Sequence, residues 1–221
     1  MLKVLINQGL HITIIVEDSI SLYFEMKVSI MMMKTHIILS NSLLNNIDEN
    51  KKFLLNDKSF IYGNVKPDIL SKYKLRKHYL DESYEMVANK IKYLSSLDLD
   101  ALEKQYTKNE FSQEMGVICH FLADFFCVAH SERWEFKHSL KIHVKYEQGL
   151  TKVAKDYSLK NDRIQYLENV DEFFERLYRE YKANGNFEEN DLKYAAYMCN
   201  TVTNYVLERI LDNTIKSHTV A

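Results

Sequence analysis

The stretch CHFLADFFCVAH, from Cys119 to His130, constrains the fold more than any other part of the chain. Its apolar side chains occupy nearly every helical position, which predicts a helix buried on most of its surface. Those apolar residues are Phe121, Leu122, Phe125, Phe126 and Val128. His120, Asp124 and His130 lie among them. We therefore expect a central helix, capped by Asn109 and continuing to about His130, that carries polar groups inside the core.

His120 and Asp124 are four residues apart, so on a helix they share a face and are separated by about 40° of rotation. An unpaired carboxylate buried among phenylalanines would cost several kcal/mol. A divalent metal bound by both side chains would offset that cost. A purely structural zinc site is less favoured, because such sites prefer cysteine.

Other parts of the chain supply further candidate ligands. His143 and Glu147 repeat the four-residue spacing on the next expected helix. His36, Asp68 and His78 lie on three earlier segments. Histidine nitrogens and carboxylate oxygens together suit zinc in a catalytic site, where a position stays open for water. Each residue alone would be better explained by packing or capping, but together they predict a site with several zinc ions.

The order of these residues resembles that of the bacterial zinc-dependent phospholipase C family. The most specific parts are the spacing from His120 to His130 and the segment YGNVKPD, which ends at Asp68. The resemblance implies an all-α fold, a single compact multi-helix bundle, in which three zinc ions line one cleft. It also implies hydrolysis of the phosphodiester bond of phosphatidylcholine and related lipids by a zinc-activated water.

The resemblance further implies how the candidate ligands divide among the ions. The first zinc would be held by Asp68, His78, His120 and Asp124, and the second by His130, His143 and Glu147. The third would be held by His36, with Asp124 as a bridging ligand. Asp68 would also orient or deprotonate the attacking water, which makes it the candidate catalytic residue.

One departure from the family bears on whether two or three zinc ions bind. In the family, the third zinc is also bound by the amino nitrogen and carbonyl of an N-terminal tryptophan, whereas the only tryptophan here is Trp134. Two alternatives stay open. One is a hydrolase like the zinc nucleases and 3′-nucleotidases, which share this architecture. The other is a non-catalytic metal-binding relative that has lost the third site.

Composition favours helices over a sandwich or barrel, because the 221 residues include only 5 glycines and 1 proline. The 3 cysteines are interpreted as small buried hydrophobic residues. A net charge of −2 gives no reason to expect a nucleic-acid partner.

The expected partners are a phospholipid or other phosphodiester substrate and, transiently, a membrane surface. With neither a transmembrane segment nor a secretory signal recognised, a cytoplasmic location is expected, although the family is mostly exported.

The positions of glycine and proline, and apolar residues at helical spacing, predict the remaining elements. A helix should begin at Thr35, which would cap it, with His36 in the first turn. Gly63 and Pro67 should form a turn that holds Asp68. Further helices are expected at Tyr79–Leu97, around His143 and Glu147, at Asn161–Ala183 and at Glu188–Lys216. Asn45–Lys58 is expected to be a polar loop or short helix, and Asp98–Lys108 a polar connection.

Residues 1–34 are expected to form an N-terminal extension, and residues 35–221 the domain that resembles zinc-dependent phospholipase C. Within the extension, the run LHITIIVEDSISLYF favours a strand or hairpin. The family-like sequence begins abruptly after a cluster of methionines, which suggests an over-extended start.

We therefore hypothesise that translation begins within that cluster, at Met26, Met31, Met32 or Met33. The intact mass of the native protein, measured by mass spectrometry, should then correspond to one of these starts. A mass that includes Met1 would contradict the hypothesis.

Overall fold

The structure is a computed structural model that describes the backbone of residues 3–7, 11–15, 20–69, 78–134, 140–157, 167 and 169–219. Side chains are described in the same ranges from Met33 onward, except at residues 140 and 141. The elements in this part of the chain are β1 (Lys3–Asn7), β2 (His11–Ile15), α1 (Ile20–Asn46), α2 (Glu49–Lys52), α3 (Asp57–Ile69), α5 (Leu80–Ser95), α6 (Leu99–Gln105), α7 (Lys108–Phe125), α8 (Val128–Ser131), α10 (Leu140–Asp156), α11 (Val170–Ala183) and α12 (Glu188–Thr219).

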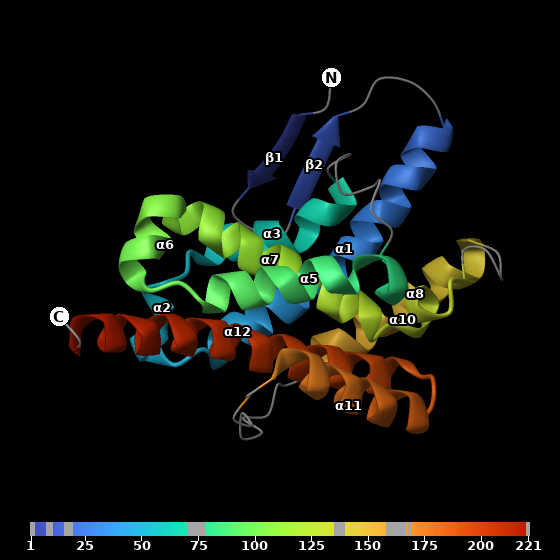
Figure 1. The fold of residues 1–221 in the computed structure, drawn as a ribbon. Coiled ribbons are helices and arrows are strands. Elements are labelled where there is room, and N and C mark those ends of the chain that lie inside the picture. The colour runs from blue at the N-terminus through green and yellow to red at the C-terminus, as the bar shows by residue number, and fades with distance from the viewer. Residues whose placement is uncertain are drawn as a thin grey trace.

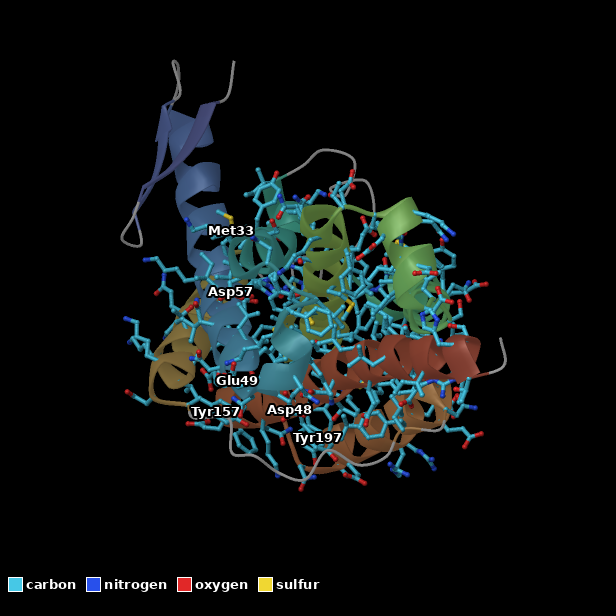
Figure 2. All side chains as sticks on the ribbon, turned by 90° about the vertical axis from the view of Figure 1, so that its left-hand side faces the viewer. Met33, Asp48, Glu49, Asp57, Tyr157 and Tyr197 are labelled. Carbon is cyan, nitrogen blue, oxygen red and sulfur yellow. The ribbon has the colours of Figure 1, made fainter. Side chains whose placement is uncertain are left out.

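Helices build the whole domain around α7, which confirms the expected all-α class (Figure 1). Every residue of α7 from Met115 to Phe125 is buried. The long helix α12 runs along one side of the domain, with α11 beside it. Side chains fill the space between the helices (Figure 2). Before α1, β1 and β2 pair as an antiparallel hairpin. The strand or hairpin expected for LHITIIVEDSISLYF is therefore confirmed at His11–Ile15, but Ile20 to Phe24 of the same run belong to helix α1.

The central helix differs from its predicted bounds at both ends. Thr107, not Asn109, caps it: the Thr107 hydroxyl accepts from the Glu110 N–H, and the Glu110 carboxylate accepts from the Thr107 N–H. This reciprocal pair is a capping box. At the other end α7 stops at Phe125, and the backbone at Phe126 leaves helical geometry. His130 therefore lies on the separate short helix α8, which turns its side chain back toward α7.

The predicted turn at Gly63 and Pro67 is wrong, because both residues lie inside α3. Gly63 is needed where α3 packs on α7, not for a turn: a Cβ there would lie 2.9 Å from the Gln113 Cα. On the facing helix, a Cβ at Gly116 would lie 2.8 Å from the Gly63 Cα. Pro67 is tolerated near the end of α3, although its missing N–H removes one intrahelical hydrogen bond. This close pairing of helices brings Asp68, in the last turn of α3, toward α7.

The helix expected to start at Thr35 begins earlier, at Ile20, so Thr35 does not cap it. Thr35 instead forms a 2.8 Å hydroxyl–hydroxyl hydrogen bond with Thr151 of α10. His36 accordingly lies in the middle of α1 and not in a first turn. No glycine or proline interrupts the chain between Ile20 and Thr35, so nothing stops the helix from extending upstream. The division of the chain at residue 35 stays a prediction.

The remaining elements follow the sequence closely. The helices expected at Tyr79–Leu97, around His143 and at Glu188–Lys216 are α5, α10 and α12. The connection at Asp98–Lys108 contains a helix, α6, which Asp98 caps by accepting from the Ala101 N–H. Most of the first part of the helix predicted at Asn161–Ala183 lies outside the described residues, and α11 covers the second part. Among the helices that the structure describes, none is long and apolar enough to cross a membrane.

We expect Gly116→Ala to destabilise the fold, because the added methyl would meet the backbone of Phe60 and Gly63. The overpacking should lower the free energy of unfolding by about 1–3 kcal/mol or more, outweighing the gain of up to about 1 kcal/mol from replacing a helical glycine. Chemical denaturation measures the effect. Gly149→Ala is the matched control, since the three atoms nearest to its methyl all belong to the flexible Glu188 side chain. Equal stabilities of the two variants would contradict the proposed role of the backbone contact.

Candidate metal centre

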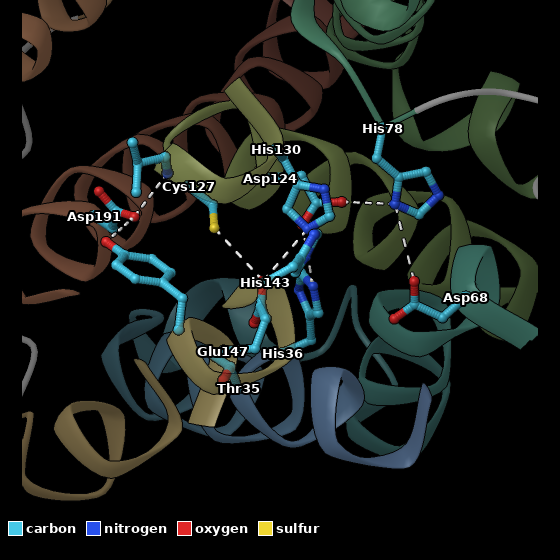
Figure 3. A network of polar contacts seen from close by, with 12 residues as sticks. Thr35, His36, Asp68, His78, Asp124, Cys127, His130, His143, Glu147 and Asp191 are labelled. Carbon is cyan, nitrogen blue, oxygen red and sulfur yellow. Dashed lines mark hydrogen bonds and ion pairs between the residues drawn. The ribbon is translucent and has the colours of Figure 1, made fainter. Parts of the chain in front are cut away.

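The structure brings all the predicted ligand residues to one place inside the domain. Figure 3 labels these residues except His120. They come from five helices and from the segment that precedes α5. The helical residues are His36 of α1, Asp68 of α3, His120 and Asp124 of α7, His130 of α8, and His143 and Glu147 of α10; His78 lies in the segment before α5. The predicted convergence of residues distant in sequence is therefore observed.

The carboxylate of Asp124 lies at the centre and faces imidazoles on both sides. Its Oδ2 is 2.8 Å from His78 Nδ1 and 3.2 Å from His120 Nε2. Its Oδ1 is 3.3 Å from His36 Nε2 and 3.8 Å from His130 Nε2. One buried carboxylate thus connects the ligand sets that the sequence analysis assigned to separate ions.

The first set has spacings suited to a single ion. His120 Nε2 lies 3.2 Å from His78 Nδ1 and 3.7 Å from Asp68 Oδ1. His78 Nδ1 lies 3.9 Å from the same Asp68 oxygen. Ligand atoms around a tetrahedral zinc, at about 2.0–2.1 Å from the ion, are about 3.4 Å apart. Asp68, His78 and His120 therefore form a group close enough to hold one ion. Asp124 Oδ2 lies beside the two imidazoles of this group.

The protonation of His120 shows why a cation fits here. Its Nδ1 lies 2.7 Å from the carbonyl oxygen of Asn64, which can only accept, so Nδ1 carries the proton. Burial lowers the pKa of His120, which favours the neutral ring. The lone pair of Nε2 then points at oxygens of Asp68 and Asp124. His78 Nδ1 also lies 3.2 Å from this nitrogen. A cation would be held well by lone pairs that converge in this way, and a carbonyl on the far nitrogen is the usual support of a metal-binding histidine.

The second set comprises His130, His143 and Glu147. Glu147 Oε1 is 3.4 Å from His130 Nε2 and 3.7 Å from His143 Nε2, and the two imidazole rings have centroids 5.0 Å apart. Cys127 was interpreted as a small buried residue, yet its Sγ lies 3.6 Å from the same Glu147 oxygen. Together with His130 and Glu147 it forms a buried group close enough to hold a metal ion.

His36 adds a third potential ligand group with His120 and Asp124. Its ring stacks on that of His120, with centroids 4.1 Å apart. His36 Nδ1 and Asp68 Oδ2 are buried and have no hydrogen-bond partner among the described residues. A cavity of about 20 Å³, lined in part by His36, Asp124 and Glu147, lies against this group. It has room for about one water molecule.

The buried charges shift one another's pKa values strongly in the metal-free chain. Burial by itself raises the pKa of Asp124, but its contacts with His120, His130 and His36 outweigh burial and hold it well below its usual range. Burial would likewise lower the pKa of His130, but Asp124 and Glu147 raise it to about 9. Glu147 has its pKa lowered to about 2, because its contacts with His130 and His143 outweigh burial. Each carboxylate therefore stays ionised only while a positive charge lies beside it.

A model of the family described as zinc dependent phospholipase C matches residues 35–188. The match spans more than half of the chain and contains every candidate ligand. The chain belongs to the zinc-dependent phospholipase C family. Searches of curated proteins and of solved structures gave no significant match. Membership indicates a zinc-dependent hydrolase of the phospholipase C type, and the nitrogen and oxygen donors of the centre fit zinc.

Three residues that contact the candidate ligands of this phospholipase C-like centre, or the helices that carry them, were not found by sequence reasoning. Asn64 contributes only its backbone carbonyl, which leaves no trace in the sequence. Cys127 could have been noticed because it lies just before His130 in the central stretch. Asp191 lies far along the chain, on α12, and contacts the segments that carry the second set. Nothing in its local sequence distinguishes it from a helix-terminal aspartate.

The stability of the metal-free protein should fall at alkaline pH. The His130 pKa is about 9 in the fold against an ordinary 6.5, so its proton stabilises the folded state fully below pH 6.5, and this contribution is lost as pH rises toward 9. In the zinc-loaded protein the ion replaces the proton, so the alkaline loss should disappear. Thermal unfolding at several pH values, with chelator or with zinc, measures both curves.

His130→Gln is the matched variant, since it removes the titrating group. Its metal-free stability should depend less on pH between 6.5 and 9 than that of the unmodified chain. Identical pH dependences with and without zinc would contradict the placement of the ion beside His130.

Proposed function

We propose that the protein hydrolyses phosphodiesters of the phosphatidylcholine type, using zinc held at the candidate metal centre. The observation that carries this proposal is the convergence of the buried Asp124 carboxylate with four imidazoles. His120 contributes to it a neutral nitrogen whose lone pair faces carboxylate oxygens. Such an arrangement is costly without cations and is suited to binding them.

Zinc would be bound in two sets joined by Asp124. The first set consists of Asp68, His78, His120 and Asp124, and the second of His130, His143 and Glu147. His36, 3.3 Å from Asp124 Oδ1, is the candidate ligand of a third ion. Bound zinc ions would supply Lewis acidity, lowering the pKa of water toward neutrality and offsetting the negative charge of a phosphodiester.

Asp68 is proposed as the catalytic residue. One of its oxygens, Oδ1, lies near His78 and His120, whereas the other, Oδ2, is buried and accepts no hydrogen bond from the described residues. Oδ2 is therefore available to orient an attacking water and to accept its proton. The water oxygen would then attack phosphorus in line with the leaving alkoxide, which takes up a proton as the bond breaks.

The substrate class rests on the family and is tested by comparing substrates. Release of diacylglycerol and phosphocholine from phosphatidylcholine vesicles would support a lipid substrate and transient contact with a membrane surface. Cleavage of single-stranded DNA, with lipid left intact, would instead indicate a nuclease-like member of the fold. A chromogenic phosphodiester reports hydrolysis irrespective of the natural substrate. No hydrolysis by a zinc-loaded chain would favour a non-catalytic relative.

We expect Asp68→Asn to lower kcat on the chromogenic phosphodiester by about 10²- to 10⁴-fold, the usual contribution of a positioned general base. Zinc content should be measured in the same preparations, because Asp68 is also a candidate ligand. Asp57→Asn, an exposed change at the start of the same helix, is the control and should leave kcat unchanged. Full activity in Asp68→Asn would remove this residue from the mechanism.

A further inference from the structure

Asp191, at the start of α12, is one of the most completely hydrogen-bonded carboxylates in the described part of the protein. It is 1% exposed. Its Oδ2 accepts from the Val128 N–H and from the Tyr146 hydroxyl, each at 2.8 Å. Its Oδ1 accepts from the Tyr181 hydroxyl at 2.8 Å. Asp191 lies just past the residues matched by the family model, and the site described above does not use it as a ligand.

Each of two donors adjoins a candidate ligand of the second set. Val128 is the first residue of α8, the short helix that carries His130. Tyr146 immediately precedes Glu147 on α10. A single carboxylate from α12 therefore ties together the two elements that present His130 and Glu147, as Figure 3 shows.

The bond to Val128 compensates for a missing local cap. Cys127 occupies the N-cap position of α8 but makes no side-chain cap hydrogen bond. The first N–H groups of a helix need acceptors, which usually come from the residue just before it. Here the acceptor is Asp191, which is distant in sequence. The direction in which α8 leaves the end of α7 is thus fixed by α12 and not by the local sequence.

We propose that Asp191 is a positioning residue that sets the geometry of His130 and Glu147 and thereby the zinc affinity of the second ligand set. The inference rests on the proposed metal centre and deepens it by assigning a residue outside the ligands. None of the three donors to Asp191 belongs to the first set or adjoins one of its residues in sequence. The residues of that set, Asp68, His78, His120 and Asp124, come from α3, α7 and the segment before α5.

The test measures zinc affinity by competition with chelators of graded strength. In Asp191→Asn the amide N–H must either oppose the Val128 N–H, which cannot accept, or donate to a tyrosine hydroxyl that now donates to Asp191. In either case the negative charge is lost, so the remaining hydrogen bonds are between neutral groups and are weaker. Supporting partners of metal ligands typically contribute about 10- to 100-fold in metal affinity. We therefore expect the zinc bound by the second set to be released about 10- to 100-fold more readily. The zinc bound by the first set should be retained as before.

The matched control is Asp171→Asn on α11. Asp171 also accepts from a tyrosine, with the Tyr84 hydroxyl 2.8 Å from its Oδ1, but it contacts none of the candidate ligands. Tyr146→Phe removes a single hydrogen bond from Asp191 and provides a milder variant if Asp191→Asn fails to fold. It should weaken the same class of zinc in the same direction, and Asp171→Asn should weaken neither class.

The outcomes separate this inference from the proposed function. A lower melting temperature with unchanged zinc affinity in Asp191→Asn and Tyr146→Phe would mean that the hydrogen bonds only stabilise the fold, and would overturn the inference. Equal weakening of both zinc classes would overturn it as well. Zinc binding without hydrolysis by the unmodified chain would overturn the proposed function alone. No zinc binding at all would overturn both.

Discussion

The negative charge of Asp124, buried in the last turn of the apolar helix α7, is the constraint on which the rest of the structure depends. Phenylalanines on the same helix exclude water from its surroundings, so the charge must be balanced by groups that the protein itself brings there. Four imidazoles lie within 4 Å of its two oxygens. Other carboxylates, Asp68 and Glu147, lie beside those imidazoles and add negative charge that protons alone balance only over a limited pH range.

Two local features of the backbone bring these groups together. Paired glycines let α3 and α7 approach closely, so the Asn64 carbonyl reaches His120 and the Asp68 side chain reaches the same ring. The break after Phe125 lets the chain reverse before His130, which then faces Asp124 and Glu147 and does not continue along α7. A continuous helix to His130, as the sequence suggested, would have carried this imidazole past the centre. The end of α7 at Phe125 is thus needed to place His130 at the metal centre.

The sequence predicted the class of fold and the residues that meet at the centre, because both leave periodic or paired signals. His120 with Asp124 and His143 with Glu147 are recognisable at helical spacing within a chain poor in glycine and proline. It failed where the deciding contact comes from elsewhere in the fold. Gly63 and Pro67 are typical of a turn, yet packing against α7 overrides that local preference. Thr35 is a good capping residue, but the helix continues through it and its hydroxyl bonds to α10.

Supporting contacts were harder still to predict, because they depend on backbone atoms or on residues distant in sequence. The carbonyl of Asn64 fixes the tautomer of His120, and any residue at that position could provide it. Asp191 takes the place of a local cap for α8, so its role is visible only once α12 is seen beside that helix. Ligands held by rigid helices lose little freedom on binding a metal. Bringing these charges together costs free energy during folding, and zinc binding offsets that cost. Zinc affinity and the stability of the fold at this centre are therefore coupled.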